Sequence, residues 1–316
     1  MQVSKSASNV GWRPNRALEP KRDENKLWLD RNENRDPIFH RFLQQTLSSL
    51  PVGPITTYPE SQDLYQKLST SLNVGSDQLL VTNGVEGGIR STFHAYVVPG
   101  DKVLHSHPTY AMYPVYADMF QAESVICRFK RGDRNLSLDA EEIKQKIEKH
   151  SPALIFIPNP DSPCGGVISR SVLEEIINLA HDVGAIVFID ETYYPFYPFT
   201  VIDMIDSCPN LLVARSASKA WGLAGLRIGF VVGHSELILN LNKVSAAYET
   251  NMLGLMMFSA LVDHQDQVNA SVKRLNHGKA YFEQAMNALG FETLSCSGNF
   301  SLVNFAASSN LSSFRD

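Results

Sequence analysis

The chain has few cysteines, and their spacing matches no common metal or redox motif. Among its 316 residues there are four, far apart, with no CxxC pair and no Cys/His spacing typical of a metal site: Cys127, Cys164, Cys208 and Cys296. Scattered cysteines are typical of reduced thiols inside the cell rather than of a disulfide framework. We therefore expect a cytoplasmic protein without metal ligands.

Long apolar runs and a basic excess are also missing. The longest strongly apolar run, Leu253–Val262, is about half of the roughly 20 residues that a membrane-spanning helix needs. No apolar stretch follows the basic residues near the N-terminus, as it would in a secretory signal. The net charge of −5 is unlike the basic balance usual in nucleic-acid binders. We therefore expect small-molecule partners, and neither nucleic acid nor a membrane.

The composition, 44% hydrophobic and 19% charged, is typical of a globular protein with a substantial core. From about residue 78, short apolar runs rich in β-branched residues alternate with amphipathic helical stretches. The expected strands are Gln78–Thr82, Lys102–His105, Ser124–Arg128, Ala153–Ile157, Ala185–Ile189, Leu211–Arg215 and Ile228–Val232. The expected helices include Ile38–Leu50, Leu138–Lys149, Ser171–Val183 and Gln265–Leu289.

Several of these strands are apolar throughout, which predicts an α/β fold with a mostly parallel sheet covered by helices on both faces. Residues 56–255 would form this large domain. The two chain ends, residues 1–55 and 256–316, would form a smaller α+β domain. Ligands of such sheets bind at the carboxyl ends of the strands. Asn159, Asp190 and Lys219 follow three of the strands, so one crevice is expected to hold all three.

Lys219 is the strongest chemical candidate. It lies in Ser216-Ala-Ser218-Lys219, followed by a glycine-rich stretch that leads to Arg227. A buried lysine that is accessible in its neutral form can make a Schiff base with an aldehyde. The two hydroxyls and the guanidinium could together bind a phosphate. Taken alone, a surface lysine beside a glycine turn explains the same residues.

Other polar residues lie where a cofactor would need them. Asp190 ends an apolar strand, and a buried carboxylate there needs a partner such as a pyridinium nitrogen. Asn159 and Tyr193 could reach a ring oxygen, and Tyr110 could stack on a ring. Each pattern also has a purely structural explanation. Asp190 could be a helix cap or a hydrogen-bonded loop aspartate, Asn159 could belong to a tight turn, and Tyr110 could pack in the core.

A fourth element is the glycine-rich turn Thr82-Asn-Gly-Val-Glu-Gly-Gly88, between a strand and an apolar helix expected to begin near Ile89. Backbone N–H groups at such a turn can bind a phosphate at the positive end of the helix. The sequence has neither the P-loop lysine pattern nor the GxGxxG dinucleotide fingerprint. Taken alone, this turn is weak evidence for a phosphate site, and it gains weight only in combination with the other motifs.

Together the motifs resemble those of the fold-type I pyridoxal 5'-phosphate (PLP) enzymes, specifically the class I/II aminotransferases and the histidinol-phosphate aminotransferase group within them. The resemblance covers most of the chain. It rests on LDRNEN (Leu29–Asn34), TYPE (Thr57–Glu60), TNGVEGGIR, HPTYAMY, PNPDSPCGG, FIDETYYPF and SASKAWGLAGLRIGF. The last is the most specific, with lysine and arginine eight residues apart.

The resemblance implies roles for the residues around the cofactor ring. Lys219 matches the lysine that holds PLP covalently and moves the proton between substrate Cα and the cofactor. Asp190 matches the residue paired with the pyridine nitrogen, and Tyr110 the stacking aromatic; these three would be the catalytic residues. Asn159 and Tyr193 match the pair on the ring oxygen, with Asn159 also near the substrate.

Further positions match the phosphate site and the family's dimer. Ser216, Ser218, Arg227 and the backbone of Val85 and Glu86 match the phosphate cradle. The resemblance also implies a homodimer, in which Tyr58 reaches the neighbouring subunit's cofactor phosphate. Asn34 matches the N-terminal segment that family members fold over the substrate.

Two departures from the family's pattern bear on substrate binding. The family's LDRNENP is LDRNENRDP here (Leu29–Pro37). We call this stretch the entry segment, and its shape is expected to differ from that in the family. Family members also continue past a strand like FSLVNFA to an arginine that binds the substrate's α-carboxylate. This sequence ends at Asp316 before such a residue, so either it is shorter than a working enzyme or the carboxylate is held differently.

We therefore expect a transaminase that moves an amino group between an amino acid, or a phosphorylated amino compound such as histidinol phosphate, and a 2-oxo acid. A PLP-dependent decarboxylase or lyase on the same fold remains open, because its cofactor site would be nearly the same. A PLP-binding protein without turnover, or an incomplete fragment, is the third reading.

Overall fold

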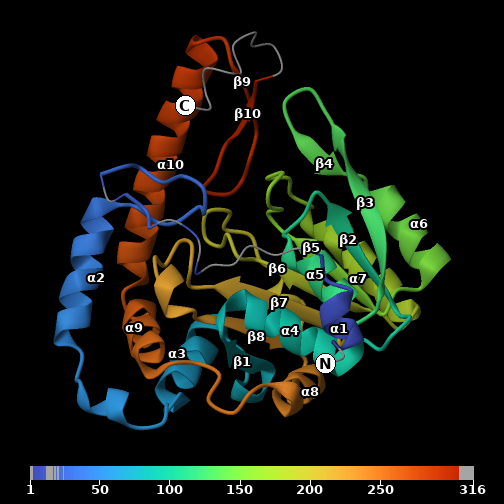
Figure 1. Cartoon of the computed structure of the whole chain (residues 1–316), viewed down its shortest axis with the longest axis horizontal. Helices are drawn as coiled ribbons and strands as arrows, with labels where there is room; N and C mark the ends of the chain where they lie inside the picture. Colours follow the sequence, from blue (N-terminus) through green and yellow to red (C-terminus); the bar gives the residue numbers. More distant parts are fainter. Residues whose placement is uncertain (1–2, 12–16, 18, 20, 24, 306–316) are drawn as a thin grey trace.

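The computed structural model describes residues 3–11, 17, 19, 21–23 and 25–305. Its centre is a sheet of eight strands in the order β1-β8-β7-β6-β5-β2-β3-β4. A separate sheet of two short strands lies beside the longest helix (Figure 1). The strands are β1 (Leu79–Thr82), β2 (Lys102–His107), β3 (Glu123–Arg131), β4 (Leu136–Leu138), β5 (Leu154–Pro158), β6 (Ile186–Asp190), β7 (Leu211–Ser216), β8 (Gly229–Gly233), β9 (Glu292–Leu294) and β10 (Leu302–Asn304).

Helices cover both faces of the large sheet. Side chains alternate along its strands between two hydrophobic clusters, one under α4, α5 and α8 and the other under α3, α6, α7 and α9. The α-helices are α1 (Lys5–Ser8), α2 (Pro37–Ser49), α3 (Gln62–Leu72), α4 (Gly84–Tyr96), α5 (Met112–Met119), α6 (Ala140–His150), α7 (Arg170–Asp182), α8 (Ser235–Val244), α9 (Met252–Val262) and α10 (Gln265–Ala288). Short 3₁₀ turns are η2 (Gly53–Thr56), η3 (Ser76–Gln78), η4 (Ile202–Met204) and η5 (Ala224–Leu226).

The predicted α/β architecture is therefore confirmed, with differences in detail. Strands β2, β3, β5, β6 and β7 run parallel, whereas β8 pairs antiparallel with both β7 and β1. Helix α4 begins at Gly84 rather than near Ile89, because the glycine-rich turn is already its first turn. Leu138 ends a short strand instead of opening a helix, and Asp139 caps α6.

The order of the strands creates a crevice in the middle of the sheet. From β2 the chain moves to β3 on one side, whereas β5, β6 and β7 follow one another on the other side. The loops that leave β2 and β5 therefore diverge at the carboxyl edge, which is where open α/β sheets bind ligands. The loops after β6 and β7 end at the same edge.

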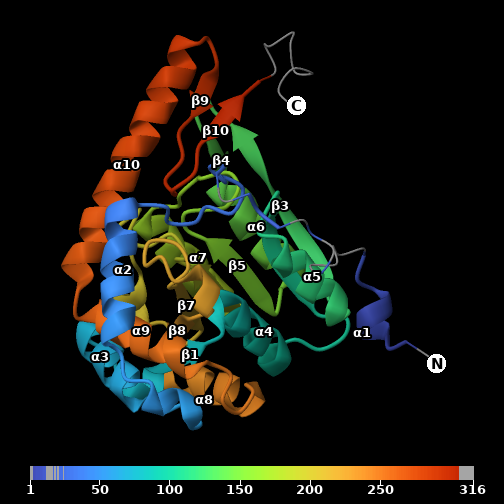
Figure 2. The ribbon, with the colours of Figure 1, turned by 60° about the vertical axis from the view of Figure 1, so that its left-hand side comes forward.

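The two ends of the chain meet beside this sheet. Helix α2 packs against α9 and α10 (Figures 1 and 2), and Asp36, which caps α2, pairs with Arg274 on α10 at 2.6 Å. The extra residues of the LDRNENRDP departure thus provide the cap, and Pro37 is the first helical residue. The boundaries drawn for a small domain, residues 1–55 and 256–316, stay a prediction, and residues 306–316 lie outside the described residues.

None of the helices described is both long and apolar enough to span a bilayer. The four cysteines are free thiols, and three of them, Cys127, Cys164 and Cys208, are buried.

Candidate active site

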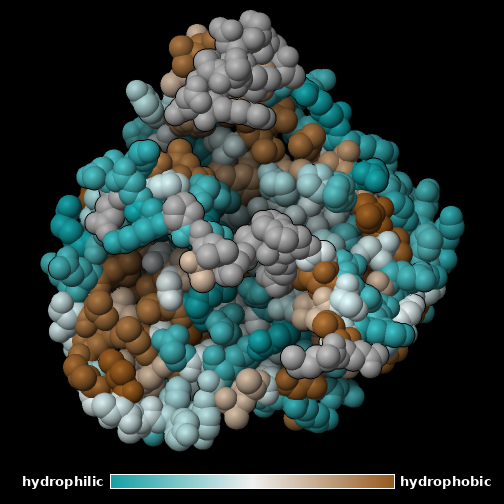
Figure 3. All heavy atoms as spheres, viewed as in Figure 1, coloured by the Kyte–Doolittle hydropathy of each residue, from teal (hydrophilic) through white to brown (hydrophobic). Residues whose placement is uncertain are grey.

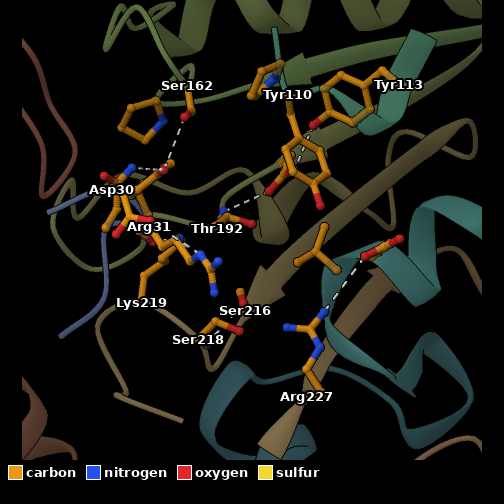
Figure 4. A pocket seen from close by; sticks show the side chains of 17 residues that line it. Asp30, Arg31, Tyr110, Tyr113, Ser162, Thr192, Ser216, Ser218, Lys219 and Arg227 are labelled. Carbon is orange, nitrogen blue, oxygen red and sulfur yellow. Dashed lines mark hydrogen bonds and ion pairs between the residues drawn. The ribbon is translucent and has the colours of Figure 1, made fainter. Parts of the chain in front are cut away.

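A cavity of about 470 Å³ opens at the carboxyl edge of the sheet, between the loops that follow β2, β5, β6 and β7. In Figure 4, Lys219, Ser216, Ser218 and Arg227 lie along one side of it, and Tyr110 and Tyr113 lie across from them. The cavity is lined by Asp30, Arg31, Asn32, Val85, Glu86, Tyr110, Tyr113, Pro158, Pro160, Ser162, Asp190, Thr192, Tyr193, Ser216, Ser218, Lys219 and Arg227. Most of the predicted site residues are therefore brought together.

Lys219 lies three residues beyond the end of β7, and its ammonium group points into the cavity region. Its Nζ donates a hydrogen bond to the backbone carbonyl of Arg31 at 2.7 Å. Burial lowers the pKa of this lysine, and nearby Arg227 lowers it further, whereas Glu33 and Asp190 oppose the shift. A lysine with a lowered pKa has more of the neutral amine that reacts with an aldehyde.

Asp190 is the last residue of β6, and only 5% of it is exposed. Its Oδ2 accepts a hydrogen bond from the Tyr113 hydroxyl at 2.8 Å, and its Oδ1 accepts one from the backbone N–H of Thr192 at 2.9 Å. Burial raises the pKa of Asp190, and these two donors oppose the rise. Asp190 is thus a buried carboxyl group with room for a cationic partner in the cavity.

The start of α4 and the end of η5 form a cradle for an anion. Gly84 has φ of +65°, and a Cβ at this position would lie 2.8 Å from Nη2 of Arg227. A Cβ on Gly229 would lie 2.8 Å from the backbone N of Val85. These glycines let Arg227 and β8 approach the first turn of α4, whose free N–H groups favour an anion.

Two buried hydroxyls complete the cradle. Ser216 and Ser218 are each less than a tenth exposed, and Ser216 Oγ accepts a hydrogen bond from the backbone N–H of Ser218 at 3.0 Å. Glu86 brings a carboxylate to the same place, 4.0 Å from Arg227. Arg227 is half-exposed, and among the residues that the structure describes it forms no ion pair closer than this one.

Tyr193 lines the cavity and Asn159 lies behind its wall, and the polar groups of both already form hydrogen bonds. The Tyr193 hydroxyl accepts a hydrogen bond from Asn32 Nδ2 at 3.0 Å and donates to Ser162 Oγ at 3.2 Å. Asn159 exchanges two hydrogen bonds with the backbone of Ile168, at 3.1 and 2.9 Å. It does not line the cavity itself, but its neighbours Pro158 and Pro160 do, and its amide nitrogen has a second hydrogen to offer.

Besides Asn159, two more predicted residues do not line the cavity, Asn34 and Tyr58. Asn34 is buried behind its wall, where Nδ2 donates to the carbonyl of Ala220 and to Ser271 Oγ at 2.9 and 3.0 Å. Asn34 thus takes part in the packing between the entry segment and α10, and its role at a substrate stays a prediction. Tyr58 is 74% exposed, and its ring stacks on Tyr248 with centroids 4.5 Å apart.

Sequence reasoning missed several residues at the cavity. Tyr113 and Thr192 hold Asp190, and Arg31 and Asn32 of the entry segment contact Lys219 and Tyr193. A signal for Tyr113 was available, because it follows Tyr110 by three residues at the start of a helix and so lies on the same side. No comparable pattern pointed to the backbone carbonyl of Arg31.

Comparisons with known proteins place this site in a family. Residues 24–315 match the family described as aminotransferase class I and II. The histidinol-phosphate aminotransferase of Thermoanaerobacter pseudethanolicus is 34% identical over 71% of this chain, and the match spans 63% of that protein, less than two thirds of its length. That of Thermoanaerobacter sp. is 31% identical over 88% of this chain and 78% of that protein.

Solved structures show the same fold. The crystal structure of histidinol-phosphate aminotransferase from Sinorhizobium meliloti in complex with pyridoxal-5'-phosphate aligns with a TM-score of 0.75 at 22% identity, covering 86% of this chain and 74% of that one. An aspartate aminotransferase of Thermus thermophilus aligns with a TM-score of 0.74 at 20% identity, over 84% and 74% of the two chains. With a family match over most of its length and relatives above 30% identity, this chain belongs to the class I and II aminotransferases.

Proposed function

We propose that the protein is a PLP-dependent aminotransferase that moves an amino group between an amino compound and a 2-oxo acid. The observation that carries the proposal is the cavity that Lys219, with a lowered pKa, shares with buried Asp190 and an anion cradle. Family membership supports the same activity.

The residues at the cavity fit PLP by charge and shape. Asp190 would hold the pyridine nitrogen in its protonated form, and a buried carboxylate is a suitable partner for that cation. Ser216, Ser218, Arg227 and the first turn of α4 would hold the phosphate. When bound, the cofactor supplies an aldehyde that takes up the amino group and a ring that draws electrons from the substrate Cα.

The remaining steps belong to the protein's own side chains. Lys219 would hold the cofactor covalently and then, as a free amine, carry the proton at the substrate Cα. Tyr110 would cover one face of the ring and exclude water from it. Tyr193 and Asn159 would donate to the ring oxygen, which requires the Tyr193 hydroxyl to release the acceptor it now donates to, Ser162 Oγ, while it can keep accepting from Asn32.

The substrate is proposed by class only. The named relatives act on histidinol phosphate, and we propose a compound of that kind or another amino acid as donor. Arg31 is a cation at the cavity, paired with Glu19 at 3.1 Å, and it offers one site for a substrate anion. Aminotransferase relatives favour transamination over the decarboxylase or lyase alternative.

We also propose a homodimer in which Tyr58 completes the partner's phosphate site. Two stacked tyrosines that are 74% and 63% exposed, Tyr58 and Tyr248, are unusual on a monomer surface. Apolar side chains gather nearby over α2 and the segment that follows it (Figure 3), and Leu47, Val52 and Ile55 are among the exposed hydrophobic residues there. A cytoplasmic location is proposed on the free cysteines.

The test is a set of visible spectra of the protein with PLP, recorded before and after addition of single amino donors such as glutamate or histidinol phosphate. An aminotransferase should show a cofactor band that Lys219→Ala lacks, and a donor should convert this band to the spectrum of pyridoxamine phosphate while the matching 2-oxo product accumulates. Release of carbon dioxide without a 2-oxo product would replace transamination by decarboxylation. A spectrum indifferent to every donor would leave only a binding protein.

A further inference from the structure

A tyrosine outside the predicted site makes direct contact with its central carboxylate. Tyr113, in the first turn of α5, donates its hydroxyl hydrogen to Oδ2 of Asp190 at 2.8 Å. In Figure 4 the dashed line of this contact runs along the cavity side on which Tyr110 also lies. Tyr113 and Asp190 are 77 positions apart in sequence and are brought together by the packing of α5 against the sheet that contains β6.

The position of this hydroxyl is fixed by the packing of its ring. Tyr113 is fully buried, and its ring stacks on Phe156 with centroids 4.5 Å apart and an interplanar angle of 13°. The edge of Tyr110 meets it at 5.6 Å and 81°. A phenylalanine would fill the same space, so the hydroxyl serves the contact with Asp190 rather than the packing of the core.

Asp190 depends on such donors because burial disfavours its charged form. Its Oδ2 receives a hydrogen bond from Tyr113 and its Oδ1 one from the Thr192 backbone, and the Thr192 side chain is a further group that lowers the pKa of Asp190. The other charged or titratable groups that act on Asp190 and Tyr113 are Lys219, Asp161, Tyr110 and Tyr193. Burial raises the pKa of Asp190, and the Tyr113 hydroxyl is one of the groups that lower it again.

We propose that Tyr113 is a positioning residue for the cofactor, which aims the Asp190 carboxylate at the ring nitrogen and keeps it ionised. This inference rests on the proposed function, since it presumes PLP in the cavity. Without cofactor, the protein can tolerate loss of the hydroxyl by protonating Asp190. With a protonated pyridine nitrogen beside it, Asp190 must stay an anion. Loss of the Tyr113 hydroxyl therefore destabilises the cofactor-bound protein and weakens cofactor binding.

The test compares two cofactors that differ only at the ring nitrogen. Wild type, Tyr113→Phe and Tyr65→Phe are titrated with PLP and with the 1-deaza analogue, in which C–H replaces that nitrogen. Tyr65 is a matched control, because its hydroxyl accepts a hydrogen bond from the Val81 N–H at 3.0 Å, away from the cavity. Melting curves confirm that each variant is folded.

We expect Tyr113→Phe to weaken PLP binding by about threefold to tenfold, the usual value of one hydrogen bond, and to leave binding of the 1-deaza analogue unchanged. Tyr65→Phe should change neither affinity. Equal losses for both cofactors, or no loss for PLP, would overturn the inference while the proposed function stands. Failure of wild type to bind PLP would overturn both.

A second measurement needs no cofactor and works even if Tyr113→Phe does not fold. Incorporation of 3-fluorotyrosine at position 113 keeps the ring but makes its hydroxyl a stronger donor. The carboxyl ¹³C signal of Asp190, assigned by its loss in Asp190→Asn, should then titrate at lower pH than in wild type. An unchanged titration would show that the hydroxyl does not act on Asp190 and would overturn the inference.

Discussion

At the residue scale, the site combines buried charges with the polar groups that make burial possible. Asp190 has two donors, Ser218 is fixed through its backbone on Ser216, and Lys219 is held by the carbonyl of Arg31. Because a buried charge without partners costs several kcal/mol, the charged forms of Asp190 and Lys219 depend on these contacts. The pH dependence of stability should therefore report on individual residues.

Asp161 should make the protein less stable as pH rises through the mildly acidic range. Burial raises its pKa to about 7, whereas the ordinary value is 3.8. Between these values the unfolded chain releases the proton while the folded protein retains it, so stability falls with rising pH. Asp161→Asn keeps the hydrogen-bonding shape and removes the titration.

We expect Asp161→Asn to gain stability relative to wild type between about pH 4 and 7, by at most about 4 kcal/mol, and to keep a constant difference above that range. Urea unfolding at a series of pH values measures it. Parallel pH profiles of the two proteins would contradict the expected titration of Asp161.

Lys219 should have the opposite dependence in the cofactor-free protein. Its folded-state pKa is lowered from the ordinary value of 10.5, chiefly by burial. Below the lowered pKa both states carry the proton, and the folded state bears the full cost of a buried ammonium. As pH rises toward 10.5 the unfolded chain holds more protons than the folded one, so stability increases.

Lys219→Met should therefore be more stable than wild type at neutral pH, with an advantage that shrinks as the pH approaches 10.5. Thermal unfolding without PLP measures it. A difference that is the same at every pH would mean that the ammonium of Lys219 is not disfavoured by folding.

Sequence reasoning identified side chains better than it identified their contacts. Lys219 and Asp190 are at the cavity because the carboxyl ends of the neighbouring parallel strands β6 and β7 meet there, and Arg227 reaches it because it precedes β8, which runs antiparallel to β7. Asn34 was placed at a substrate from its motif alone, but its amide is used by Ala220 and Ser271. No local pattern reveals a partner 186 or 237 positions away.

At the element scale, the cap of helix α2 fixes the end of the entry segment against α10. Asp36 caps α2 and also pairs with Arg274 on α10, and only 3% of its side chain is exposed. Asp139 caps α6 and pairs with Lys130, but at the surface. Both aspartates thus cap a helix, but only Asp36 also forms a buried ion pair that joins its helix to another one.

Asp36→Ala should lower the free energy of unfolding more than Asp139→Ala does. Loss of a cap costs about 1 kcal/mol at either site. At position 36 the change also leaves the half-buried Arg274 without its buried partner, which adds about 1 to 3 kcal/mol. Chemical denaturation of both variants tests this, and equal losses would show that the α2–α10 contact contributes nothing.

The elements themselves were largely predictable, since apolar strands of four to nine residues and amphipathic helices leave strong periodic signals. The direction of β8 was not predictable, because the hydrophobic pattern of a buried strand does not distinguish parallel from antiparallel pairing. Leu136–Leu138 was also missed as a strand, since its pairing with β3 is a tertiary contact that overrides a weak local preference.

At the scale of the whole molecule, the cavity and the exposed Tyr58 are separate features in one chain. Tyr58 does not line the cavity of its own subunit, although its motif predicts contact with a cofactor phosphate. A second copy of the chain would reconcile these facts, because the tyrosine could then reach the partner's site.

Subunit mixing tests this arrangement. Lys219→Ala and Tyr58→Ala should each have little activity, but after mixing and subunit exchange the hybrid contains one site with neither change, so activity should return. Tyr281→Ala provides a control, because Tyr281 is equally exposed, at 73% against 74%, and lies on α10. Full activity of Tyr58→Ala alone, or no recovery on mixing, would contradict a shared site.

The attachment of PLP to Lys219 is the central claim, and borohydride reduction followed by peptide mass spectrometry tests it most directly. After incubation with PLP and reduction, the account predicts a pyridoxyl group on the peptide that contains Lys219, and on no other lysine at stoichiometric level. A label on a different lysine, or no label at all, would contradict it.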